Sequence, residues 1–125
     1  MINILLVGTG GFIGSVCRYL LGGAVQRMLH TLRFPYGTLA VNVIGCFLIG
    51  FVYGLGNSKQ FFSTEARLFL ATGFLGGFTT FSSFGYETFA LARDVNITAA
   101  LGNVALQLII GLTAVWLGDA FSRLY

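Results

Sequence analysis

The residues best suited to chemistry lie within one stretch, residues 73–84, which has the sequence GFLGGFTTFSSF. Gly76 and Gly77 each disfavour a helix by about 1 kcal/mol relative to alanine. The hydroxyls of Thr79 and Thr80 can bond main-chain groups that a helix would otherwise pair. Because the surrounding segment is apolar, broken backbone there persists only where protein, water or an ion satisfies it. We therefore expect an interrupted helix with an ion site beside it.

A face of hydroxyls and aromatic rings follows this interruption. At about 100° per residue, one side of the continuing helix collects the side chains of Thr80, Phe81, Ser83, Phe84, Glu87 and Thr88. Hydroxyls are neutral hydrogen-bond donors, and the edge of an aromatic ring carries partial positive charge. This face mixes hydroxyls, two aromatic rings and one carboxylate, whereas a face turned to lipid would show leucine.

Polar residues also interrupt the other apolar segments. Arg18 faces either a bundle interior or a water-filled cavity, or it extends to the membrane interface. The amide of Asn42 is either a bond between helices or a neutral donor for an anion. Asn103, Gln107 and Gly111 follow a spacing of i, i+4 and i+8. These features either line one narrow polar path or make hydrogen bonds between helices.

The composition is that of a membrane protein. Hydrophobic residues make up 56% of the chain and charged residues 9%, whereas soluble domains are about 25% charged. The length of 125 residues leaves room for one domain of about four spans, each of roughly 20 residues. We predict an all-α integral membrane protein whose third helix is broken near the bilayer midplane. The predicted spans are residues 2–26, 38–55, 63–93 with a break near 76–80, and 97–120.

Helix ends and helix contacts are also predictable. Thr38 is expected to cap the second span, and Ser63 the third, with Glu65 in its first turn. Gly10 and Gly14 have the spacing that allows another helix to approach closely.

The positive charges are balanced across the predicted membrane. Lys59, Arg67 and Arg123 fall on one side, and Arg27, Arg33 and Arg93 on the other. Because orientation follows the Lys/Arg bias of short loops, we expect insertion both ways and an antiparallel, dual-topology homodimer. A break on its two-fold axis would bring two sets of carbonyls together, and such a cage suits a small hard cation.

Three motifs resemble those of the Fluc (CrcB) fluoride channels. They are GFIG at residues 11–14 with Arg18-Tyr19, GTLAVN at residues 37–42 with Gly45, and the stretch at residues 73–84. The resemblance covers essentially the whole chain. It implies a dual-topology dimer with fluoride pores and a structural sodium ion at the interface.

The resemblance also implies roles for single residues. The main-chain carbonyls of Gly76 and Thr79 would bind the sodium ion. The ring edges of Phe81 and Phe84 would contact fluoride, and Asn42 would be the amide donor of the pore.

Further residues would extend this pore. The hydroxyls beside it belong to Thr80, Ser82 and Ser83. Arg18 matches a basic vestibule residue, and Glu87 an acidic residue near a pore mouth. Asn103 and Gln107 stand where the family often has Tyr and Ser, and they are possible members of the track.

The function implied is a fluoride-selective channel, multi-pass in the cell (inner) membrane, that exports fluoride passively and lowers its cytoplasmic level. No nucleophile–base pair, metal-ligand cluster or phosphate loop in context is visible, so we predict neither an enzyme nor a nucleic-acid partner. One alternative is a small dual-topology drug or cation exporter, which needs a membrane-embedded carboxylate, whereas the first span has Arg18 and no acid. The other is a non-conducting scaffold subunit, which leaves Phe81 and Phe84 unexplained.

Overall fold

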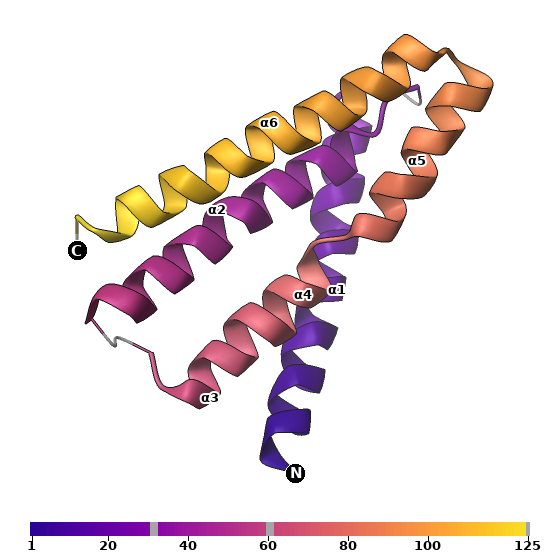
Figure 1. The fold of residues 1–125 in the computed structure, drawn as a ribbon. Coiled ribbons are helices and arrows are strands. Elements are labelled where there is room, and N and C mark those ends of the chain that lie inside the picture. The colour runs from indigo at the N-terminus through magenta and orange to yellow at the C-terminus, as the bar shows by residue number, and fades with distance from the viewer. Residues whose placement is uncertain (31–32, 60–61, 125) are drawn as a thin grey trace.

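The structure, a computed structural model, describes residues 1–30, 33–59 and 62–124, and of residues 57–59 it describes only the backbone. Every regular element in these residues is a helix. In chain order the elements are α1 (Ile2–Met28), α2 (Tyr36–Lys59), α3 (Thr64–Arg67), η1 (Leu68–Leu75), α4 (Gly76–Phe78), α5 (Phe81–Asp94) and α6 (Ile97–Ser122) (Figure 1).

Four helical segments are long and apolar enough to cross a membrane. They are Ile2–Met28, Tyr36–Gly56, Thr64–Asp94 and Ile97–Ser122. At about 1.5 Å per residue, each reaches the roughly 30 Å thickness of a hydrocarbon core. The prediction of an all-α membrane protein with four spans is confirmed.

Side-chain caps explain where three of the helices begin. Ser63, Thr80 and Asn96 each precede a helix, and each accepts a hydrogen bond from the N–H group three residues on, at 2.7–3.2 Å. The predicted cap at Ser63 is therefore confirmed. The predicted cap at Thr38 is wrong, because α2 begins two residues earlier. Thr38 lies in the first turn of α2, and its hydroxyl donates to another helix.

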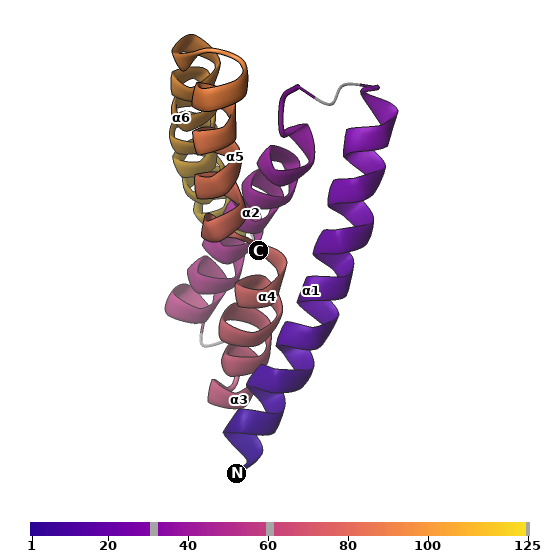
Figure 2. The ribbon, with the colours of Figure 1, turned by 90° about the vertical axis from the view of Figure 1, so that its right-hand side faces the viewer.

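Glycines bring the spans into close contact. A Cβ atom at Gly10 or Gly14 would collide with main-chain atoms of the third span, including those of Phe74. The predicted close approach at these two glycines is confirmed. Gly50 on α2 and Gly118 on α6 likewise allow close contact, because a Cβ atom at either would collide with main-chain atoms of the other helix. These two helices run side by side in Figure 1. Figure 2 shows α1 on one side of the molecule and α5 with α6 on the other.

The third span changes conformation before α5. Residues 68–75 form a π-helix, a wide-turned form that is rare and often found at functional sites. After the short α4, the main chain is extended at Thr79 (φ −83°, ψ 162°) and Thr80 (φ −151°, ψ 119°), and α5 starts at Phe81. Main-chain groups at these two threonines therefore need partners outside the usual helical pattern.

The packing at Gly14 gives a direct test of the fold. We expect Gly14→Ala to lower the free energy of unfolding by about 1–3 kcal/mol, because the methyl group would displace main chain that has no room to move. The matched control is Gly8→Ala on the same helix, where a Cβ atom would meet nothing within 4 Å. Unfolding in mixed detergent measures both variants, and equal stability of the two would contradict the packing.

Candidate functional site

Asn42 on α2 holds the main chain at Thr80. Its Oδ1 atom accepts a hydrogen bond from the Thr80 N–H group at 2.9 Å, and its Nδ2 atom donates to the Thr80 carbonyl at 3.2 Å. The side-chain amide thus pairs with both main-chain groups of one residue, as a neighbouring strand would. We call this pair of bonds the Asn42 clasp.

The clasp changes the pairing of the carbonyls in α4. In a continuing helix the Thr80 N–H group would donate to the carbonyl of Gly76, four residues earlier. It donates to Asn42 instead. The Gly76 carbonyl is thereby released from that helical bond, so its oxygen can serve another ligand.

Arg18 on α1 turns toward the same segment. Its Nη1 atom donates to the Thr79 carbonyl at 3.2 Å, and Ser15, one turn earlier, donates to the Gly77 carbonyl at 3.4 Å. The Arg18 side chain is half-buried. Its guanidinium therefore lies within the bundle, beside the extended main chain, and not at a helix end.

A cavity of about 390 Å³ lies beside Arg18, and we call it the hydroxyl cavity. Hydroxyl groups dominate its polar lining, together with the Arg18 guanidinium. The hydroxyls come from Ser15, Tyr19, Thr38, Thr80, Ser82 and Ser83. Among the described residues that line it there is no carboxylate. Three of these hydroxyls already donate within the protein, Ser15 to the Gly77 carbonyl, Thr38 to Glu87 and Thr80 to Ser83. The cavity can therefore offer an anion the positive charge of Arg18 and its remaining hydroxyls.

Phe81 and Phe84 line a second space, a groove of about 370 Å³ that we call the phenylalanine groove. Their ring centroids are 5.6 Å apart and the planes are inclined by 53°. Phe81 is 83% exposed. The described lining comes from α2, the third span and α6. Thr80 lines both this groove and the hydroxyl cavity, so both spaces border the extended main chain.

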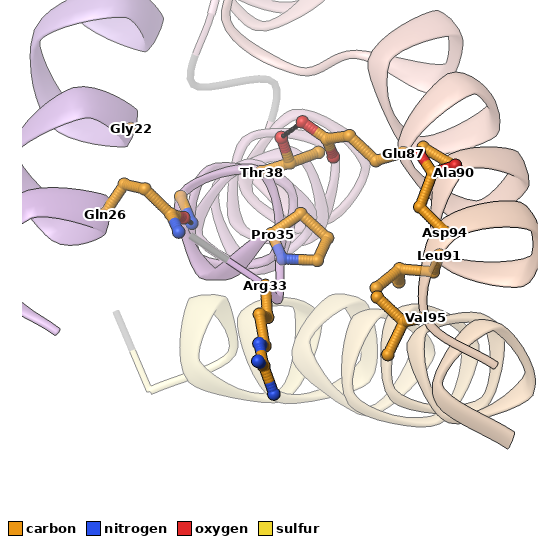
Figure 3. Close-up of a pocket in the computed structure, with 11 residues that line it drawn as sticks. Gly22, Gln26, Arg33, Pro35, Thr38, Glu87, Ala90, Leu91, Asp94 and Val95 are labelled. Carbon is orange, nitrogen blue, oxygen red and sulfur yellow. Dashed lines mark hydrogen bonds between the residues drawn. The ribbon is translucent and has the colours of Figure 1, made fainter. Parts of the chain in front are cut away.

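Glu87 lies at a third space, a cavity of about 530 Å³. Its Oε1 atom accepts a hydrogen bond of 2.7 Å from the hydroxyl of Thr38, as Figure 3 shows. Arg33 and Asp94 also line this cavity, so it carries charges of both signs. Thr38 lines both this cavity and the hydroxyl cavity. Glu87 therefore lies next to the hydroxyl cavity, but it is not among the residues that line it.

The polar stripe of α6 divides between two partners. Asn103 is fully buried, and its Nδ2 atom donates to the Thr88 hydroxyl on α5 at 2.9 Å. Gln107, one turn later, accepts a hydrogen bond from Asn42 Nδ2 at 3.2 Å and lines the phenylalanine groove. Asn103 thus joins α6 to α5, whereas Gln107 joins α6 to the clasp.

Two residues of the site were not singled out from the sequence. Ser15 lies three positions before Arg18, and this helical spacing could have placed it on the same face. Thr38 was taken for a cap, yet its hydroxyl links Glu87 to the hydroxyl cavity. Nothing in the sequence pairs Thr38 with Glu87, because that contact depends on how α2 and α5 pack.

Comparison with known proteins identifies related chains. A sequence model of the family described as CrcB-like protein, Camphor Resistance (CrcB), matches residues 5–119. A protein of Chlorobaculum tepidum is 49% identical over 125 residues, which is 100% of this chain and 98% of its own. A protein of Geobacter sulfurreducens is 47% identical over 123 residues, 98% of each chain. One of Methylobacillus flagellatus is 43% identical over 118 residues, 94% of this chain and 92% of its own. All three are named fluoride-specific ion channel FluC.

Proposed function

The chain belongs to the CrcB-like protein family, and from this premise we propose that it is a fluoride-selective channel of the cell membrane. It crosses the membrane four times and lets fluoride leave the cell passively, which lowers the cytoplasmic level of the ion. It is a transport protein and not an enzyme.

The hydroxyl cavity is the observation that carries this proposal. Fluoride is small and strongly hydrated, so a pore must replace its water with other donors. The cavity supplies one guanidinium and a set of hydroxyls, with no carboxylate among its described lining residues to repel the ion. Neutral donors bind an anion weakly enough for it to leave again, as conduction requires.

The proposed path runs from the hydroxyl cavity past Thr80 to the phenylalanine groove. Ser82 and Ser83 continue the hydroxyls, and both interact with the Thr80 hydroxyl, at 3.3 and 3.2 Å. Phe81 and Phe84 then present ring edges, whose positive potential stabilises an anion.

Three other polar residues stand beside this path. Arg18 attracts the ion into the hydroxyl cavity, and Glu87 lies at the adjoining mouth. Asn42 borders the phenylalanine groove.

We further propose that two antiparallel copies form the channel, with the third span broken near the bilayer midplane. The balanced Lys and Arg residues favour insertion both ways. The phenylalanine groove supports the dimer, because Gln107 Nε2 has no partner among the described residues, lipid cannot pair with it, and Phe81 is largely uncovered. A second copy laid over the groove would supply both polar partners and apolar cover.

A sodium ion at the two-fold axis completes this proposal. Carbonyls of interrupted helices are suitable ligands for sodium. The Gly76 carbonyl is released by the Asn42 clasp, and the Thr79 carbonyl keeps one lone pair beyond its bond to Arg18. The donor set therefore fits a hard monovalent cation, with Gly76 and Thr79 of each copy as the ligands.

Anion efflux from liposomes tests the function. Purified protein is reconstituted into liposomes loaded with potassium fluoride or potassium chloride, and valinomycin balances the charge. We expect fast release of fluoride with chloride retained. Release of neither ion would leave the scaffold and exporter alternatives, and release of both would contradict selectivity.

Phe81→Ile tests the ring edges. The change keeps an apolar side chain but removes the ring, and we expect fluoride efflux to slow roughly tenfold, as loss of about 1.4 kcal/mol at the barrier would give. Phe12→Ile on α1, at a residue 72% exposed, is the control and should conduct like wild type. Equal rates for both variants would remove the rings from the mechanism.

Added charge tests dual topology. Two lysines inserted within residues 57–60 should bias all copies toward one orientation and abolish most fluoride efflux. Two glutamines inserted at the same place are the control. Co-expression with a chain carrying two extra lysines after Val95 should restore efflux, because the two biases are opposite. Full activity of the first variant alone would argue against the antiparallel dimer.

A further inference from the structure

Gln26 on α1 holds the main chain where it enters α2. Its Nε2 atom donates to the Phe34 carbonyl at 3.0 Å, and its Oε1 atom accepts from the Gly37 N–H group at 3.0 Å. One side-chain amide thus pairs with a main-chain carbonyl before α2 and a main-chain N–H group inside it. We call this pair of bonds the Gln26 clasp.

The Gln26 clasp supplies an acceptor that α2 itself lacks. The helix begins at Tyr36, so Gly37 lies in its first turn, where N–H groups have no acceptor within the helix. A capping side chain next to the helix usually fills this need. Here Gln26 fills it from another span, so the start of α2 is tied to α1.

The first turn of α2 is held from two sides. A Cβ atom at Gly37 would collide with the main-chain oxygen of Gly22, which lies one turn before Gln26 on α1. On the other side, the Thr38 hydroxyl donates to Glu87 on α5. In Figure 3, Gln26 and Glu87 lie on opposite sides of Thr38. This turn is therefore fixed between α1 and α5.

The same turn borders two cavities. One is the hydroxyl cavity, and the other is the cavity of about 530 Å³ beside Glu87, which we call the mouth cavity. Gly37 and Thr38 are the described residues that line both. Gln26 lines the mouth cavity alone of the two. The direct way from the mouth cavity to the hydroxyl cavity therefore runs past the turn that Gln26 holds.

We propose that Gln26 is a positioning residue for fluoride entry, which keeps Gly37 and Thr38 in place at the border between the mouth cavity and the hydroxyl cavity. This assignment rests on the proposed function. Gln26 acts through the main chain that it binds and not by contact with the ion. Without its amide, the first turn of α2 keeps its bond to Glu87 but loses both bonds to α1, so the border no longer has one shape.

Gln26→Met tests the proposal through the fluoride efflux rate. The change keeps nearly the same length and removes both hydrogen bonds. We expect efflux at low fluoride to slow at least roughly fivefold, with a smaller change at saturating fluoride, because entry limits transport when the ion is scarce. The control is Thr9→Val on the exposed side of α1, where the hydroxyl bonds only within its own helix. This control should conduct like wild type.

The liposome assay also separates positioning from folding. The fraction of liposomes that release fluoride counts active channels, whereas the rate of release from those liposomes reports how each channel works. A residue needed only for folding would lower the fraction and leave the rate unchanged at every fluoride concentration. A positioning residue lowers the rate at low fluoride.

A second measurement works on the wild-type chain. In detergent-solubilised protein labelled with ¹⁵N-glycine, the Gly37 amide should exchange its hydrogen slowly, although it lies in the first turn of a helix. In Gln26→Met the same amide should exchange faster. Fast exchange in the wild type would overturn the clasp, whether or not the variant folds.

The outcomes separate this inference from the proposed function. If the wild-type chain releases no fluoride, the channel itself is refuted. If the wild type conducts and Gln26→Met conducts equally well at every fluoride concentration, only the role of Gln26 is refuted. Equal slowing at low and saturating fluoride, or a loss of active liposomes alone, refutes a role in entry as well.

Discussion

The extended main chain at Thr79 and Thr80 is the constraint on which the rest of the structure depends. In hydrocarbon each unpaired main-chain group costs several kcal/mol, so an interruption inside a span must be satisfied by neighbouring spans. Asn42 pairs with both groups of Thr80, and Arg18 pairs with the Thr79 carbonyl. Because these side chains come from α2 and α1, the interruption decides where both helices must lie. It also explains why an amide and a guanidinium are tolerated in apolar segments.

Residues whose role is set by their own helix could be predicted from the sequence. Ser63 caps because its hydroxyl bonds an N–H group three residues on, and Gly10 and Gly14 share one face through helical spacing. The four spans follow from hydropathy and length alone. Each of these features depends on residues close together in the sequence, so each can be predicted from the sequence alone.

Residues whose role depends on packing could not be predicted. Asn103 and Gln107 lie on one face of α6 by their spacing. In the structure, however, Asn103 is hydrogen-bonded to Thr88 and Gln107 to Asn42. That division depends on how α2 and α5 each pack against α6. The π-helix at residues 68–75 likewise has no sequence signal that we recognise, although it lies directly against the glycines of α1.

A positive charge and neutral hydrogen-bond donors would act differently on fluoride in this site, because the charge binds the ion much more strongly. A unit positive charge about 4 Å from fluoride is worth about 4 kcal/mol at an effective dielectric constant near 20, close to a thousandfold in occupancy. Several such charges along the path would hold the ion and stop conduction. The Arg18 guanidinium already donates one of its N–H groups to the Thr79 carbonyl, which leaves fewer donors for an anion. On the proposed path the ion would meet hydroxyls, ring edges and amides beyond Arg18, so attraction at the hydroxyl cavity would be followed by groups that let fluoride move on.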